Sequence, residues 1–218
     1  LTLQTHAPAR RCFLTPIPQL SSAADLLASA ADCLLAGDAA NARQLVAEAD
    51  MPVIAAYTAL VTGAVNPLVH WQSAMPCVGA EVERSDQRMP SSSSERAIYV
   101  RDGWRCRYCG TRVIDRSMRT RLHRWLPDVA RWGARNPDKH TALAALSASL
   151  DHVNPHSRGG TNDEPNLVTA CNACQFGRGQ WTLEEVGFFD PREFPPTLDA
   201  WDGLTRLSRL ATTSNDLQ

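Results

Sequence analysis

Hydrophobic positions in the first third of the chain recur at helical spacing and predict three short helices over residues 21–63. Gly37 is expected to end the first helix, because glycine readily adopts the left-handed conformation that follows many helix C-termini. Asp38 and Pro52 stand where the second and third helices are expected to begin. The block contains no histidine and a single basic residue, so nothing in it predicts catalysis.

Proline, glycine and serine mark the boundaries of the remaining segments. Residues 1–20 predict an irregular arm, and residues 64–93, which end in a run of serines, predict a linker. Residues 191–218 predict a tail that begins proline-rich and contains one further helix from Asp199. Residues 94–190 are therefore expected to form a second domain.

This second domain mixes helical spacing with short stretches of alternating polarity. A short helix is expected from Ser94, and residues 116–149 predict two or three helices, one of which extends to Trp132. Two short strands and a helix that begins near Cys174 complete the pattern, with the strands expected at residues 149–153 and 167–170. We expect an α+β fold with a small two-strand and helix core, a helical insertion at residues 111–148, and the all-α block in front.

Charge is strongly segregated along the chain, although the net charge is only −1. Residues 96–135 hold eleven arginines and three acidic residues, a net charge of +8, and both flanking segments are acidic. Such a segment predicts either a surface that binds a polyanion or a solvated helical face. The apolar content of 44% is ordinary for a soluble globular protein. The sequence contains no run of about 18 apolar residues, so it predicts no membrane-spanning helix.

Four of the seven cysteines form two Cys-x-x-Cys pairs, Cys106 with Cys109 and Cys171 with Cys174. An odd number of cysteines argues against a closed disulfide framework, and we expect a reducing, cytoplasmic location. Two such pairs predict a structural Zn²⁺ with four thiolate ligands that joins distant segments of the chain. Two redox-active dithiols are the alternative.

A polar motif between the two cysteine pairs begins with Asp151 and His152 and continues through a glycine-containing loop to Asn166. Hydrolysis of a phosphodiester needs a base to activate water, a divalent metal and a cation near the phosphate. A carboxylate such as Asp151 suits a hard metal, and histidine titrates near neutral pH and suits the base.

Together these motifs make the chain resemble the HNH endonucleases of the ββα-metal superfamily, in particular bacterial members with two Cys-x-x-Cys pairs. The resemblance covers residues 94–187 and includes the segment from Arg101 to Gly110, the Asp151-His152 pair and the second cysteine pair. It implies two antiparallel strands and a helix around one catalytic metal. It also implies His152 as the general base, Asp151 as a metal ligand and Asn166 as the residue that orients the histidine.

The chain departs from the family pattern just after the second cysteine pair. The family has histidine or asparagine there as a metal ligand, whereas this chain has Gln175. Glutamine offers the same carbonyl oxygen on a longer stem, so we expect Gln175 and Asp151 to hold Mg²⁺ or Mn²⁺. Arg178 stands where the family often has lysine, and we expect it to contact the scissile phosphate.

The arginines of the insertion are expected to grip the backbone of a nucleic acid, with DNA as the first expectation. The residues assigned to this contact are Arg112, Arg116, Arg119, Arg121, Arg124 and, in the loop after the first strand, Arg158. A nucleic-acid-binding zinc module with little or no activity is one alternative, and a zinc-organised protein-interaction domain is another. The N-terminal helices are candidates for dimerisation or for binding a protein partner.

Overall fold

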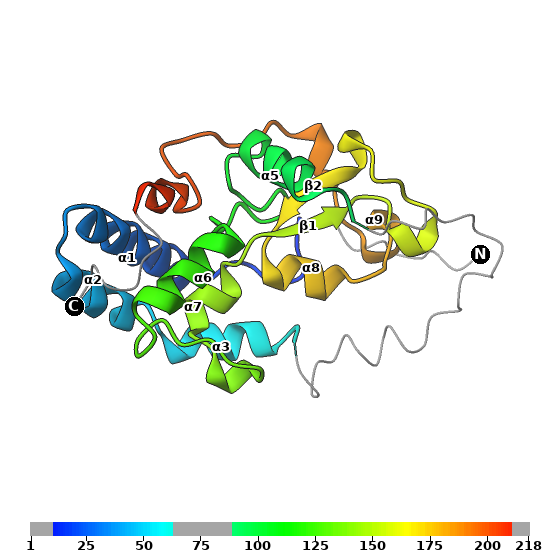
Figure 1. Cartoon of the computed structure of the whole chain (residues 1–218). Helices are drawn as coiled ribbons and strands as arrows, with labels where there is room; N and C mark the ends of the chain where they lie inside the picture. The colour runs from blue at the N-terminus through cyan, green and yellow to red at the C-terminus, as the bar shows by residue number, and fades with distance from the viewer. Residues whose placement is uncertain (1–10, 63–88, 211–218) are drawn as a thin grey trace, which may run out of the picture.

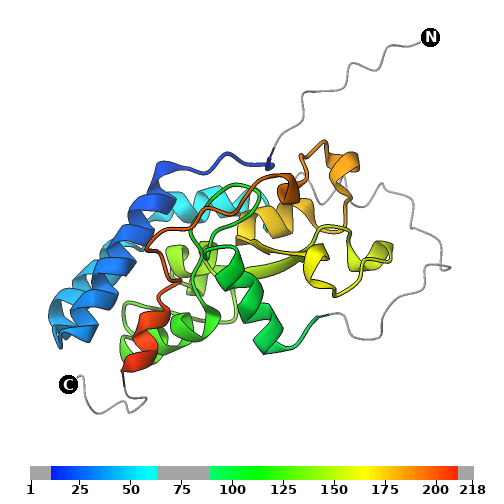
Figure 2. The same ribbon diagram turned by 90° about the horizontal axis from the view of Figure 1, so that it is seen from above.

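The computed structural model describes residues 11–62 and 89–210 (Figure 1). Its centre is an antiparallel hairpin in which Ser149 pairs with Ala170 and His152 pairs with Leu167. Every residue of both strands is buried, because α5 packs against the strands on one side and α8 lies on the other (Figures 1 and 2). The elements have these bounds: α5 Ser92–Arg101, β1 Ser149–His152, β2 Leu167–Ala170 and α8 Asn172–Arg178.

The three expected N-terminal helices are confirmed. They are α1 (Pro18–Leu35), α2 (Ala39–Glu48) and α3 (Pro52–Ala59). Gly37 has φ +81° after α1, and the Asp38 side chain caps α2 by accepting a hydrogen bond from a backbone N–H. The first helix begins three residues earlier than residue 21, because Pro18 fits the first turn of a helix.

A separate N-terminal module is not confirmed, because these helices share one continuous buried cluster with the rest of the described chain. α3 packs against α7 (Thr141–Ala145), and α1 contacts the 3₁₀ helix η5 (Thr205–Arg209). His140, fully buried, places its Nε2 2.8 Å from the carbonyl oxygen of Val46. The Asp50 carboxylate accepts a 2.7 Å hydrogen bond from the backbone N–H of Thr141.

The insertion contains α6 (Arg116–Trp125), the 3₁₀ helix η1 (Asn136–Asp138) and α7. Asp115 caps α6, whose inner face buries Met118, Leu122 and Trp125 at helical spacing. The expected extension of this helix to Trp132 is wrong: Pro127 disfavours helical backbone at Leu126, which has φ −131° and ψ 58°. The arginines of α6 therefore lie on one short helix that is anchored by its apolar face.

The two strands and the following helix confirm the core expected from the sequence, within a few residues at each boundary. The loop between the strands is close-packed at Gly160, where a Cβ would lie 1.8 Å from the carbonyl oxygen of Asn154. It contains the 3₁₀ helices η2 (His156–Arg158) and η3 (Glu164–Asn166). The loop backbone is thereby held in one shape beside β1.

The C-terminal part differs more from expectation. The helix expected from Asp199 is the short η5, because Leu204 adopts a positive φ of 66° and breaks the pattern. Two further short elements, α9 (Leu183–Val186) and η4 (Pro191–Glu193), precede it. Most of the expected linker and part of the expected arm lie outside the described residues. None of the helices in the described ranges has the length and apolar character to cross a membrane.

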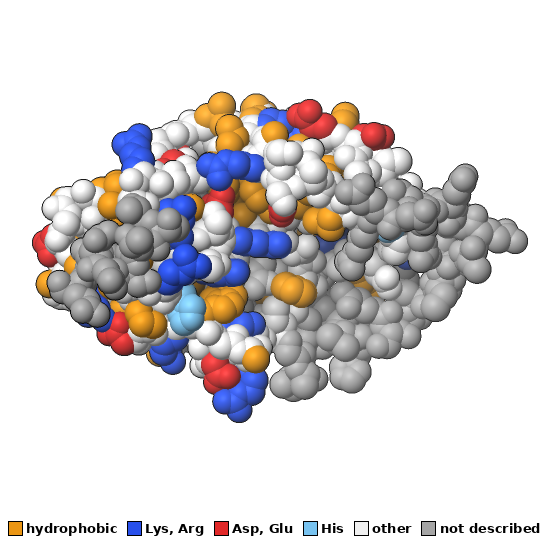
Figure 3. Space-filling view, viewed as in Figure 1, with side chains coloured by type: hydrophobic (Ala, Val, Ile, Leu, Met, Phe, Trp, Pro, Cys, Tyr) orange, Lys and Arg blue, Asp and Glu red, His pale blue; other side chains and the backbone are white. Residues whose placement is uncertain are grey.

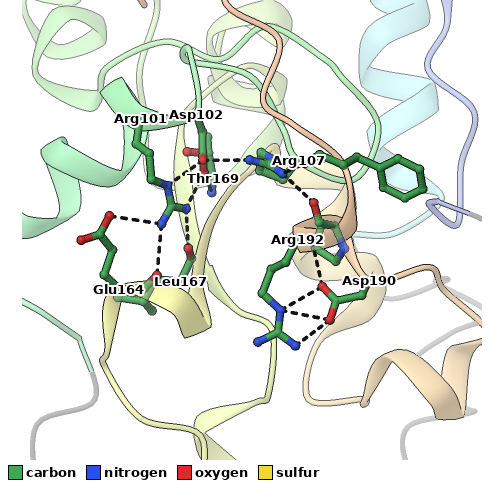
Figure 4. Close-up of polar contacts among 10 residues, drawn as sticks. Arg101, Asp102, Arg107, Glu164, Leu167, Thr169, Asp190 and Arg192 are labelled. Carbon is green, nitrogen blue, oxygen red and sulfur yellow. Dashed lines mark hydrogen bonds and ion pairs between the residues drawn. The ribbon is translucent and has the colours of Figure 1, made fainter.

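A buried carboxylate ties α5 to β2 (Figure 4). Asp102 is fully buried and accepts hydrogen bonds from Arg101, from Arg107 and, at 2.8 Å, from the backbone N–H of Thr169. Arg101 also donates to the carbonyl oxygen of Leu167, at 2.7 Å. One carboxylate therefore fixes the segment of the first cysteine pair against the second strand.

Replacing Asp102 with asparagine should destabilise the fold by about 3–5 kcal/mol, since it leaves two arginines without their shared counter-charge. Urea unfolding followed by circular dichroism measures this change. Asp138→Asn is the control, because the ion pair of Asp138 with Arg135 lies at the surface and its loss should change stability little. Equal stability of the two variants would contradict the structural role of Asp102.

Candidate functional site

The two cysteine pairs converge at one point of the structure. Cys106 and Cys109 flank a tight turn in which the Gly110 N–H donates a 2.8 Å hydrogen bond to the Cys106 carbonyl oxygen. Cys171 and Cys174 lie at the start of α8, directly after β2. All four Sγ atoms lie within 4.8 Å of one another, and three of the four residues are buried.

This cluster fits a tetrahedral zinc ion. Zn–S bonds of about 2.3 Å require sulfur atoms about 3.8 Å apart, and the Sγ atoms of Cys109 and Cys171 are 3.6 Å apart. Neighbouring thiols act in opposite directions within the cluster: hydrogen bonding from Cys106 lowers the pKa of Cys109 well below its usual range, while hydrogen bonding with Cys106 raises the pKa of Cys174 well above it. Four thiolates crowded together require a cation, so the donor set indicates zinc.

A cleft of about 860 Å³ opens between β1 and α8 and brings most of the expected site together. Its lining includes Asp151, His152, Gln175 and Arg178, together with His156 and the exposed Phe176. The strand delivers Asp151 and His152, α8 delivers Gln175, Phe176 and Arg178, and η2 delivers His156. Residues far apart in the sequence thus meet in one concave site.

Two side chains donate hydrogen bonds to the Asp151 carboxylate. Tyr108 donates a 2.8 Å hydrogen bond to Oδ2, and Arg178 donates to the same oxygen from Nε at 3.0 Å and from Nη2 at 2.8 Å. Among the described residues, the hydrogen bonds to this carboxylate all go to Oδ2, which leaves Oδ1 for a ligand in the cleft. Burial raises the pKa of the Asp151 carboxyl, against the lowering effect of Arg178, and a bound cation would favour its charged form.

His152 is oriented by a residue that the sequence did not single out. Its Nε2 lies 2.8 Å from Oδ1 of Asn162. Because an amide oxygen only accepts hydrogen bonds, this contact places the proton on Nε2 and leaves Nδ1 as the basic nitrogen. Three asparagines occur in this loop, and only the folded backbone shows that Asn162 is the one that reaches the ring.

Asn166 and Gln175 have different contacts from those the sequence indicated. Asn166 braces the loop: its side chain bonds to the backbone N–H and C=O of Asn154 and to the carbonyl oxygen of Thr161. It therefore supports His152 through the loop backbone. Gln175 lines the cleft, but its Oε1 accepts a hydrogen bond from Ser149 and its Nε2 donates to the Leu150 carbonyl oxygen at 3.2 Å.

Arg178 is placed differently from the expected phosphate contact. Its side chain is 1% exposed, and its guanidinium donates to Asp151 and to the carbonyl oxygens of His152, Val153 and Trp181. A buried guanidinium with this many acceptors holds the end of β1 against α8. The sequence could not show this role, because the same residue type at a surface would bind phosphate.

The six arginines assigned to nucleic acid divide into three pairs. Arg112 pairs with Asp25 of α1 at 2.7 Å, and Arg158 pairs with Glu185 at 3.1 Å, so both are neutralised within the fold. Arg121 donates to the carbonyl oxygen of Leu210, and Arg124 is exposed. Arg116 and Arg119 project from α6 beside the cleft, and the structure brings Lys139 and Trp132 to them.

Cys174→Ser should abolish zinc binding and unfold the protein, because the metal-binding free energy of a structural zinc site contributes directly to folding. We expect zinc content by atomic emission to fall from one ion per chain, together with loss of solubility or a large drop in melting temperature. Cys33→Ser is the matched control, since this half-buried cysteine lies outside the cluster. A stable, zinc-free Cys174→Ser variant would contradict the structural role of the metal.

Comparison with known families agrees with this geometry. Residues 136–175 match the sequence model of the HNH endonuclease family. The matched segment runs from η1 through both strands to Gln175, and so includes Asp151, His152 and the second cysteine pair. No curated protein and no solved structure gives a significant match. Residues 136–175 of the chain are therefore similar to an HNH endonuclease domain, and the four clustered cysteines form a zinc-type site.

Proposed function

We propose that the protein is a divalent-metal-dependent endonuclease that hydrolyses phosphodiester bonds in DNA. The observation that carries this proposal is the convergence of Asp151, His152 and Gln175 on one cleft within the segment that matches the HNH family. The free thiols fit a reducing compartment such as the cytoplasm.

The cleft offers the oxygen donors that Mg²⁺ and Mn²⁺ prefer. Oδ1 of Asp151 faces no protein donor in the described chain, and the Gln175 carbonyl oxygen has a second lone pair beyond the one that Ser149 uses. These two residues would hold the ion, which stabilises negative charge on the phosphate and the leaving oxygen. Arg178 and Tyr108 keep the carboxylate turned toward the cleft.

His152 supplies the base. Nδ1 removes a proton from a water molecule, the resulting hydroxide attacks phosphorus, and one ester P–O bond breaks. The leaving oxygen takes a proton from solvent, and Nδ1 later returns its own proton to water. Asn162 accepts a hydrogen bond from Nε2, which fixes the orientation of the ring and leaves Nδ1 as the nitrogen that takes the proton.

A nucleic-acid-binding module without cleavage is the second candidate. One observation favours it: the Gln175 side chain already bonds to Ser149 and Leu150, at the position where the family has a metal ligand. Binding of DNA with no cleavage in any divalent metal would support this candidate over the first.

Substitution of His152 by alanine should reduce cleavage of supercoiled plasmid by at least about 100-fold, the usual contribution of a general base. The assay uses Mg²⁺ and Mn²⁺ in parallel and measures zinc content in the same preparation. His123→Ala is the control, because this imidazole bonds to the Ala130 carbonyl oxygen away from the cleft. Equal cleavage by wild type and His152→Ala would refute the assignment of the base.

Gln175→Ala should raise the Mg²⁺ concentration needed for half-maximal cleavage by about tenfold or more, since it removes one of two protein ligands. Gln175→Asn should retain part of the affinity because it keeps the amide oxygen. Gln180→Ala, an exposed neighbour on the rim of the same cleft, is expected to leave the titration unchanged. If Gln175→Ala has the wild-type Mg²⁺ dependence, this residue is no ligand.

A further inference from the structure

A second, smaller cleft of about 290 Å³ lies next to the first and shares Gln175 and Phe176 with it. Three cations line it, Arg116, Arg119 and Lys139, and no carboxylate is among its described lining residues. We call it the basic cleft. Figure 3 shows Lys and Arg side chains gathered over the part of the surface that α6 and α7 occupy in Figure 1.

Two of the three cations of the basic cleft, Arg119 and Lys139, are held by neutral groups and form no ion pair among the described residues. Arg119 stacks on the Trp132 ring, with its guanidinium carbon 3.9 Å from the ring centroid, and donates a 3.1 Å hydrogen bond to the Ser147 hydroxyl. Lys139 donates to the Asn136 side chain at 3.0 Å, with its Nζ 5.4 Å from the same ring. The ion-pair partner of Arg116 is Glu95, at 4.0 Å.

Other arginines of the insertion do form close ion pairs. Arg112 pairs with Asp25, Arg131 with Asp50, and Arg135 with Asp138. Those ion pairs join the insertion to α1 and to the turn between α2 and α3, or brace it locally. Carboxylates therefore pair closely with the outer arginines, whereas in the basic cleft Arg119 and Lys139 form no ion pair among the described residues and Arg116 has a long one with Glu95.

This arrangement is unfavourable in the free protein. Burial lowers the pKa of Arg119, and the neighbouring Arg116 charge lowers it further. Like charges held close together on a half-buried surface repel each other, and an anion placed between them removes that repulsion. Side chains already fixed by stacking and hydrogen bonding also lose little entropy when an anion binds.

We propose that the basic cleft binds backbone phosphates of the substrate strand a few nucleotides from the scissile phosphate. This inference rests on the proposed function and adds to it a defined path for the strand. One side of α8 links the two clefts: the part-buried Asn172 lines the basic cleft, Gln175 lines both, and Gly179, directly after the helix, lines the larger cleft that holds Asp151 and His152. At 1.5 Å per residue this side of the helix spans about 10 Å, enough to separate contacts with neighbouring phosphates of one strand.

Equilibrium binding in the cleavage-deficient His152→Ala background tests the path. A fluorescein-labelled DNA duplex is titrated without added Mg²⁺ or Mn²⁺, and anisotropy is measured from 50 to 200 mM NaCl. Arg119→Gln with Lys139→Gln should weaken binding by at least tenfold at the lowest salt. The slope of log K against log salt should fall by about 1.8, because each lost phosphate contact contributes about 0.9.

Two further variants make the result specific. Arg135→Gln removes a cation from the same insertion that already pairs with Asp138, and it should leave affinity and slope unchanged. Arg119→Lys keeps the charge and should retain the wild-type slope, even though it loses the stacked, planar guanidinium. Melting temperature and zinc content confirm that each variant is folded.

The outcomes separate this inference from the proposed function. Unchanged affinity and slope in the folded Arg119→Gln, Lys139→Gln variant, while the wild type cleaves plasmid, would overturn the path and leave the nuclease intact. An equal loss of binding in Arg135→Gln would also overturn it, since the effect would then follow net charge. Absence of both binding and cleavage in the wild type would reject the nuclease itself.

Discussion

The cluster of four thiols is the contact on which the rest of the site depends. It joins the turn of the first cysteine pair to the beginning of α8, two segments that the strands and the whole insertion separate in sequence. Tyr108 lies within that turn, and Arg178 lies at the end of that helix. Both donate to Oδ2 of Asp151, so the two elements held by the cysteines also set the direction in which the carboxylate points.

The arginines of this chain have two distinct roles. Arg101 and Arg107 surround the buried Asp102 and fix the first cysteine pair to β2, whereas Arg178 balances Asp151 inside the core. In the basic cleft, Arg119 and Lys139 have no carboxylate partner among the described residues and remain available to an anion. A high arginine count alone therefore says little about binding, and the distribution of carboxylates decides which arginines face a ligand.

The sequence predicts the local elements well. Serine, aspartate and glycine at helix ends, alternation in the strands and the two cysteine pairs locate the core, because each depends on neighbouring residues. It predicts less where distant segments meet. The packing of α3 on α7, the burial of Arg178 and the reach of Asn162 to His152 depend on tertiary contacts that no spacing rule encodes. α6 ends early because Pro127 disfavours helical backbone at Leu126, and a prediction from apolar periodicity alone does not take this proline into account.

The central claim is that the protein binds two different metal ions at two separate sites. Anomalous diffraction from crystals soaked in Mn²⁺, recorded at the zinc and manganese absorption edges, tests it directly. The account predicts a zinc peak between the sulfur atoms of Cys106, Cys109, Cys171 and Cys174. It also predicts a manganese peak in the cleft within bonding distance of Asp151. A cluster without zinc, or manganese bound only away from Asp151, would contradict it.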